Sequence, residues 1–117
     1  MQRYELIAWI GDDHGLADDQ IDELLHEAET IADEYEDDQQ GAAEALTAAY
    51  RLMTEAPEDL VNELATRRTN AVIEQANATA GLRQIAITRI NNGDATEAGF
   101  ARQVGVDRMT VRKWIGK

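Results

Sequence analysis

Cysteine and serine are both missing from this sequence. The lack of cysteine excludes disulfides, thiolate zinc sites and a cysteine nucleophile. The lack of serine excludes serine hydrolase and serine recombinase chemistry. No apolar run approaches the roughly 18 residues of a membrane span, and the start, MQRYELIAWIGDD, lacks the features of a signal peptide. We therefore expect a cytoplasmic protein with no catalytic residues and no cofactor.

Basic residues are scarce in the first half of the chain. Residues 1–66 contain 19 acidic residues against Arg3 and Arg51, for a formal net charge of -17. Residues 67–117 contain nine arginines and lysines against four acids, for a net charge of +5, and together the two parts give the whole-chain value of -12. Such asymmetry indicates two different roles, unless the acids are simply solvated helix faces.

Histidine is nearly absent as well, with only two in the chain. One group of residues has side chains that could bind a metal, but its spacing gives little support to a metal site. Asp12, Asp13, His14 and Asp18 lie close together, but His14 has no second histidine at ligand spacing. We interpret the group as a solvated polar turn and expect no bound metal.

Proline occurs once, and little of the chain alternates as a strand does, which predicts an all-α fold. Tyr4–Ile10 is short and apolar, so its periodicity does not separate helix from strand, although no nearby segment could pair with a strand. An amphipathic helix is predicted from Asp18 or Asp19, both natural N-caps. Its apolar residues are spaced by three and four: Ile21, Leu24, Ala28, Ile31 and Tyr35.

A second helix is expected to follow the polar run at residues 36–41. Its apolar stripe has small residues that allow close helix packing, and consists of Ala42, Ala45, Leu46, Ala49, Tyr50 and Met53. Pro57 suits the first turn of a third helix. If it continues unbroken to about Ile90, this helix is about 50 Å long at 1.5 Å per residue. Gly81 is the expected kink, and the run Asn91-Asn92-Gly93 is the expected stop.

The last segment, GFARQVGVDRMTVRKWIG, has the pattern of two short helices joined by a tight turn. The run Asp94-Ala95-Thr96-Glu97 offers an N-cap for the first helix, Asp107 caps the second, and Gly105 can adopt the positive φ of the turn. The expected framework residues are Phe100, Ala101, Val104, Gly105, Val106, Val111 and Trp114. Gly99 lies inside the first helix and should weaken it by up to about 1 kcal/mol relative to alanine.

This framework resembles the helix-turn-helix units at the C-termini of DNA invertases and resolvases, and those of many phage-type regulators. The resemblance covers about residues 82–117, with Ile85, Ala86 and Ile90 on the supporting helix. The upstream sequence has neither the catalytic serine nor the arginine-rich site of those enzymes. The alternative is a helical hairpin that packs only on the rest of the protein.

The resemblance implies that the second motif helix lies in the major groove of DNA. A helical wheel directs Val111 and Trp114 into the core and leaves the opposite face free. The implied base-reading residues are Arg108, Met109, Arg112 and Lys113. The implied phosphate contacts are Thr96, Arg102, Thr110 and Lys117.

The expected organisation is an acidic helical region at residues 1–80 and a helix-turn-helix domain at residues 81–117. Because one such unit binds weakly and such proteins commonly work as dimers, we expect a homodimer formed through residues 18–80. The function predicted is a small transcriptional regulator of a phage, plasmid or similar element. The alternative is an antitoxin-like adaptor whose acidic half binds a basic protein partner while the C-terminal unit anchors it to DNA.

Overall fold

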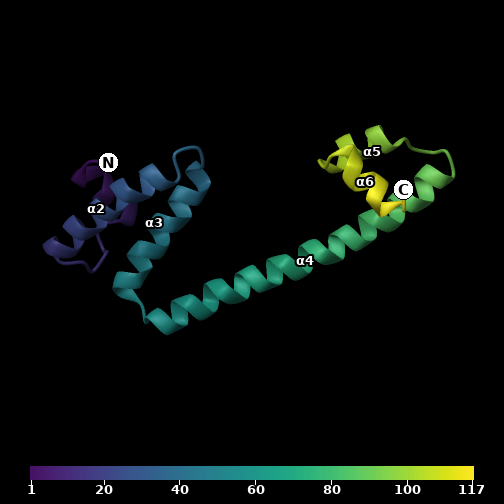
Figure 1. Ribbon diagram of the computed structural model, residues 1–117. Helices are drawn as coiled ribbons and strands as arrows, with labels where there is room; N and C mark the ends of the chain where they lie inside the picture. Colours follow the sequence, from purple (N-terminus) through teal and green to yellow (C-terminus); the bar gives the residue numbers. More distant parts are fainter. The chain divides into compact units, whose positions relative to one another are not determined.

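All regular structure in the computed structural model, which describes residues 1–117, is helical (Figure 1), so the expected all-α class is confirmed. None of the helices combines the length and apolar character needed to cross a bilayer. The Tyr4–Ile10 stretch lies within the first helix. The six helices are α1 (Arg3–Ile10), α2 (Asp18–Glu34), α3 (Gln39–Thr54), α4 (Pro57–Asn91), α5 (Glu97–Val104) and α6 (Arg108–Trp114).

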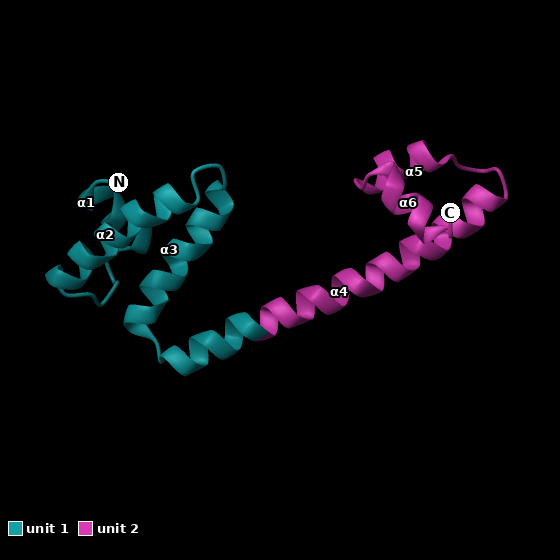
Figure 2. Cartoon of the chain, in the orientation of Figure 1, with its two compact units in different colours: residues 1–65 teal, residues 66–117 magenta.

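The contacts divide the chain into two compact units, Met1–Ala65 (unit 1) and Thr66–Lys117 (unit 2), as Figure 2 shows. The division falls inside α4, earlier in the chain than the boundary after residue 80 that the sequence suggested. Since residue 66 is an uncharged threonine, unit 1 has the formal net charge of -17 and unit 2 that of +5. The charge asymmetry therefore coincides with the structural division.

Unit 1 is built around α2, which packs against both α1 and α3. Leu6 of α1 and Leu24 of α2 are fully buried. The buried cluster consists of Leu6, Leu16, Ile21, Leu24, Ala28 and Leu46. Three- and four-residue spacing on α2 thus produces the buried face that the sequence predicted.

The loop between α1 and α2 is held by His14, which is partly buried, whereas Asp12 and Asp13 are exposed in the polar turn that the sequence predicted. Its Nδ1 accepts a hydrogen bond from the Leu16 backbone N–H at 2.8 Å, and its carbonyl accepts one from the Tyr50 hydroxyl at 3.0 Å. The imidazole therefore has a local structural partner. No three acidic or histidine side chains form a group that could hold a metal ion.

Two helix starts differ from the sequence expectation. Ala17, not an aspartate, precedes the first residue of α2, and its N–H donates to Gln20 Oε1 at 2.9 Å. Asp18 instead lies in the first turn, where the helix dipole favours a carboxylate. α3 begins at Gln39 rather than Ala42, because Asp38 caps it by accepting from the Gly41 N–H at 2.8 Å.

The join between α3 and α4 contains an arginine between two carboxylates. Arg51 donates to Glu55 through Nε at 2.6 Å and also pairs with Glu63. These hydrogen bonds raise the pKa of Arg51, and the bonds from Arg51 lower the pKa of Glu55. A carboxyl with a lowered pKa stabilises the fold above its ordinary pKa, and this contribution is lost as the pH falls through the lowered value.

The expected end of α4 is confirmed. The helix ends at Asn91, and Gly93 follows with φ of 79°. The N–H of Asp94 donates back to the Arg89 carbonyl at 2.8 Å. Earlier in α4 the helix continues through Gly81.

Two glycines provide a matched test of backbone conformation. A β-carbon at Gly81 or at Gly105 would have no new neighbour within 4 Å, but only Gly105 has positive φ, at 84°. We expect Gly81→Ala to stabilise α4 by about 0.5–1 kcal/mol, and Gly105→Ala to destabilise unit 2 by about 1–2 kcal/mol. Urea unfolding followed by circular dichroism measures both changes. If both variants were stabilised, or both destabilised, the result would contradict the conclusion that Gly105 needs a left-handed backbone and Gly81 does not.

Candidate nucleic-acid interface

The two short C-terminal helices pack around one apolar cluster with the last turns of α4. Ala86 and Val111 are fully buried, and Phe100 and Ala101 are nearly so. The cluster is completed by the partly buried Leu82, Ile90, Val104, Val106, Trp114 and Ile115. The expected apolar framework residues therefore come together, with α4 supplying the supporting surface.

The turn between α5 and α6 has the predicted conformation. Gly105 is left-handed, with φ of 84° and ψ of 30°. Its N–H and that of Val106 both donate to the Ala101 carbonyl, at 2.9 and 3.1 Å. Because L side chains rarely adopt this conformation, glycine lets the chain turn sharply from α5 into α6.

Asp107 caps α6 as expected, and within the expected run at residues 94–97 it is Thr96 that caps α5. The two caps involve two of the predicted phosphate-binding residues. Thr96 Oγ1 accepts from the Gly99 N–H at 3.0 Å. Asp107 Oδ1 accepts from the Thr110 N–H at 2.8 Å and from the Thr110 hydroxyl at 3.3 Å. The Thr110 hydroxyl would have to leave Asp107 to donate to a phosphate, whereas Thr96 uses only its acceptor in the cap.

The Thr96 cap also bears on Gly99. A β-carbon there would lie 2.9 Å from Thr96 Oγ1. The glycine thus costs helix propensity but leaves room for the capping hydroxyl.

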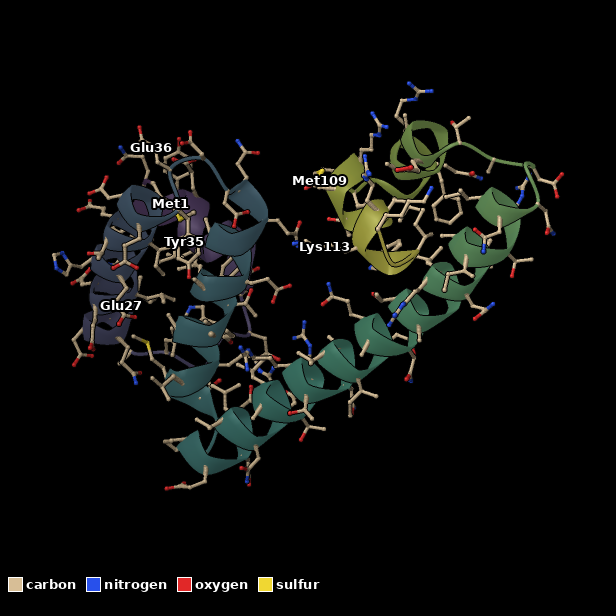
Figure 3. The ribbon with its side chains drawn as sticks, turned by 45° about the vertical axis from the view of Figure 1, so that its right-hand side comes forward. Met1, Glu27, Tyr35, Glu36, Met109 and Lys113 are labelled. Carbon is tan, nitrogen blue, oxygen red and sulfur yellow. The ribbon has the colours of Figure 1, made fainter.

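The face of α6 opposite Val111 is open. Met109 and Lys113 are both exposed, and Figure 3 shows them on the same side of the helix. The Arg108 side chain is 61% exposed and that of Arg112 is 39% exposed. The four predicted base-reading residues therefore lie on one short helix, but the arginines are not equally free.

Glu97, in the first turn of α5, is a site residue that the sequence reasoning missed. Its side chain is only 15% exposed, and its Oε1 lies 3.5 Å from Arg112 Nε and 4.0 Å from Arg108 Nε. Oε1 is buried and accepts no hydrogen bond. Its charge is therefore balanced only by the two neighbouring guanidinium groups of α6.

Two other arginines of unit 2 are used within the fold. Arg83 Nε donates to the Trp114 carbonyl at 3.3 Å, which ties the end of α6 to α4. Arg89 donates to the Asp94 carbonyl at 3.2 Å. Arg102 and Lys117, both predicted to contact phosphates, are exposed and form no ion pair.

Comparisons with protein-family models, with curated proteins and with solved structures find no match to this chain.

The Glu97 contact predicts an unequal cost of removing its partners. Arg112→Ala leaves a largely buried carboxylate with one distant cation, and should destabilise unit 2 by about 1–3 kcal/mol. Adding Glu97→Gln should recover much of that loss, because the uncompensated charge is removed. Urea unfolding of the single and double variants measures both changes.

Arg102→Ala is the matched control, since this arginine is exposed and has no carboxylate partner; its effect should stay within about 0.5 kcal/mol. Equal stability of Arg112→Ala and the double variant would show that Glu97 does not depend on Arg112.

Proposed function

We propose that this protein binds double-stranded DNA sequence-specifically and that α6 contacts the bases, as the second helix of a helix-turn-helix unit does. The observation that carries the proposal is the open face of α6. Met109 and Lys113 are exposed on a helix whose other face is buried through Val111. This helix belongs to the basic unit of an otherwise acidic chain. A basic surface supplies the phosphate attraction on which DNA affinity largely depends.

The side chains on this face suit the major groove, which admits one α-helix. Lys113 and Arg112 supply donors for guanine O6 and N7, each good contact discriminating by roughly 1–3 kcal/mol. Met109 has no strong donor or acceptor and would contact a thymine methyl. Arg108, near the start of α6, extends the set. Thr96, Arg102, Thr110 and Lys117 would contact phosphates, which position the protein without reading sequence.

In this proposal Glu97 contributes to sequence specificity, because it competes with DNA for Arg112. A base contact by Arg112 requires its guanidinium to exchange the carboxylate, 3.5 Å away, for a guanine edge. A sequence without guanine at that position offers no replacement for the lost ion pair. Glu97 would therefore penalise wrong sequences more than right ones.

The test is selection of bound fragments from random-sequence DNA, with the intact chain and with Arg112→Gln/Lys113→Gln. We expect the intact chain to enrich one motif and the variant to lose it, with at least a tenfold fall in affinity because each contact is worth roughly 1–3 kcal/mol. Arg67→Gln/Arg68→Gln is the matched control, since it removes the same charge from α4.

The control should keep the motif and lose affinity only modestly. Equal losses in both variants would mean that binding depends on charge alone. Failure of the intact chain to enrich any motif at low salt would contradict the proposal. Because Arg112 also balances Glu97, unfolding curves of the variant are needed beside the binding data.

The proposal includes a homodimer, as in a small regulator of a phage, plasmid or similar element, with contacts drawn from residues 18–80. Val61, Val72 and Ile73 of α4 are more than half exposed, and every residue from 65 to 78 is exposed. A helix in water gains little stability without packing, which favours a partner for this surface. Dimers of such units read half-sites about 34 Å apart.

The dimer predicts that Val61→Glu/Val72→Glu lowers the mass of the full chain in sedimentation equilibrium from that of a dimer to that of a monomer. Two buried carboxylates would oppose association, because charges are costly to desolvate. Asn62→Glu/Asn70→Glu adds the same charge at polar positions and should leave the dimer intact. A native chain that sediments as a monomer at micromolar concentration contradicts the dimer.

A further inference from the structure

Unit 1 contains an apolar groove that the DNA-binding proposal does not use. A cavity of about 460 Å³ is bordered by α1, α2 and α3. Its apolar lining includes Met1, Trp9, Ile31 and Leu46 together with alanines of α2 and α3. Figure 3 labels Met1, one of the residues at this groove.

Small side chains keep the groove open. Ala32 on α2 and Ala42 and Ala43 on α3 line it, where larger residues would fill the space between the helices. Trp9 is 44% exposed and Met1 is 53% exposed at the same place. Tryptophan and methionine are enriched in the cores of protein interfaces, and methionine adapts its shape to different partners.

The groove also has an acidic edge that no lysine or arginine of unit 1 neutralises. Glu29 and Asp33 line it, and neither forms an ion pair. Unit 1 has only two basic side chains, and both are already engaged: Arg3 pairs with Asp18 and Asp22, and Arg51 pairs with Glu55 and Glu63. Apart from the amino group of Met1, which itself lines the groove, a cation that pairs with this edge would come from a lysine or arginine outside unit 1.

We infer that this groove binds a basic amphipathic helix of a second protein. An apolar stripe at positions i, i+3, i+4 and i+7 would enter the groove, as helices do in apolar grooves elsewhere. Lysines or arginines beside that stripe would pair with Glu29 and Asp33. An extended peptide is disfavoured, because unit 1 has no sheet edge to which a strand could be added.

Self-association of unit 1 through this groove is disfavoured by charge. In such a pair each copy would bring the same acidic edge, Glu29 and Asp33, to the contact, with no free lysine or arginine to oppose it. The dimer proposed above relies instead on the exposed apolar residues of α4. The inference rests on unit 1 alone. It stands or fails independently of DNA reading by α6.

The test is selection with the full chain from a displayed library of helical peptides of about five turns, in which both the apolar stripe and the flanking positions are randomised. We expect enriched peptides to combine an apolar stripe with a net positive flank. Fluorescence anisotropy of one enriched peptide then gives the affinity for the chain and its variants.

Ala32→Phe fills the groove at an exposed position and should weaken peptide binding at least tenfold. Glu29→Gln/Asp33→Asn should weaken it and reduce its salt dependence. Asp19→Asn/Glu23→Gln removes the same charge from α2 outside the groove lining and should have less than a twofold effect.

Three results would overturn the inference. Enrichment of basic peptides without an apolar stripe, or equal binding by Ala32→Phe, would mean that the charge of unit 1 attracts cations with no role for the groove. No enrichment would mean that no such helix binds. Dimers of the chain that dissociate on Ala32→Phe would assign the groove to a second copy.

Discussion

Burial of Val111 is the contact on which the C-terminal unit depends. α6 has only seven residues, far below the length at which a helix is stable alone in water. Its conformation therefore comes from the packing of Val111 against α4 and α5 and from the Asp107 cap. The same contact decides which side chains remain outside, because fixing one face of a helix fixes the opposite one. The surface that we propose reads DNA is thus a consequence of a core contact.

The charge of the chain follows its division into units, and this separation would allow the two kinds of recognition that we propose. Unit 2 directs cations outward from short helices, where a polyanion would meet them. Unit 1 neutralises both of its arginines internally, and all but Glu27 of its remaining carboxylate residues are exposed. A mixed distribution would weaken both surfaces, since acids beside α6 would repel phosphates. Glu97 is the exception, and it is largely buried between two arginines.

Periodicity predicted the helices well, because residue spacing is a local property of a sequence, whereas the caps were predicted for the two C-terminal helices but not for α2 and α3. The buried face of α2 and the left-handed turn at Gly105 could both be predicted from the sequence. The Glu97–Arg112 contact could not, since it depends on how α5 crosses α6. The groove could not be predicted for a related reason: stripe alanines such as Ala42 suggest close helix packing, and only the helix positions reveal that Ala42 lines open space. The hydrogen bond from the Ala17 N–H to Gln20 at the start of α2 could not be predicted either, because alanine is not a preferred N-cap residue.

Each unit contains one tryptophan, Trp9 in unit 1 and Trp114 in unit 2, and the chain contains no cysteine. Trp9 is the more exposed of the two and lies at the groove, whereas Trp114 packs on the C-terminal cluster. Their emission spectra should therefore differ, and replacing either one by phenylalanine leaves an intrinsic fluorophore that reports on a single unit. Any cysteine introduced by mutation would be the sole thiol, so a dye placed there could be paired with a chosen tryptophan for energy transfer. The chain is thus well suited to optical study of each half in the presence of the other.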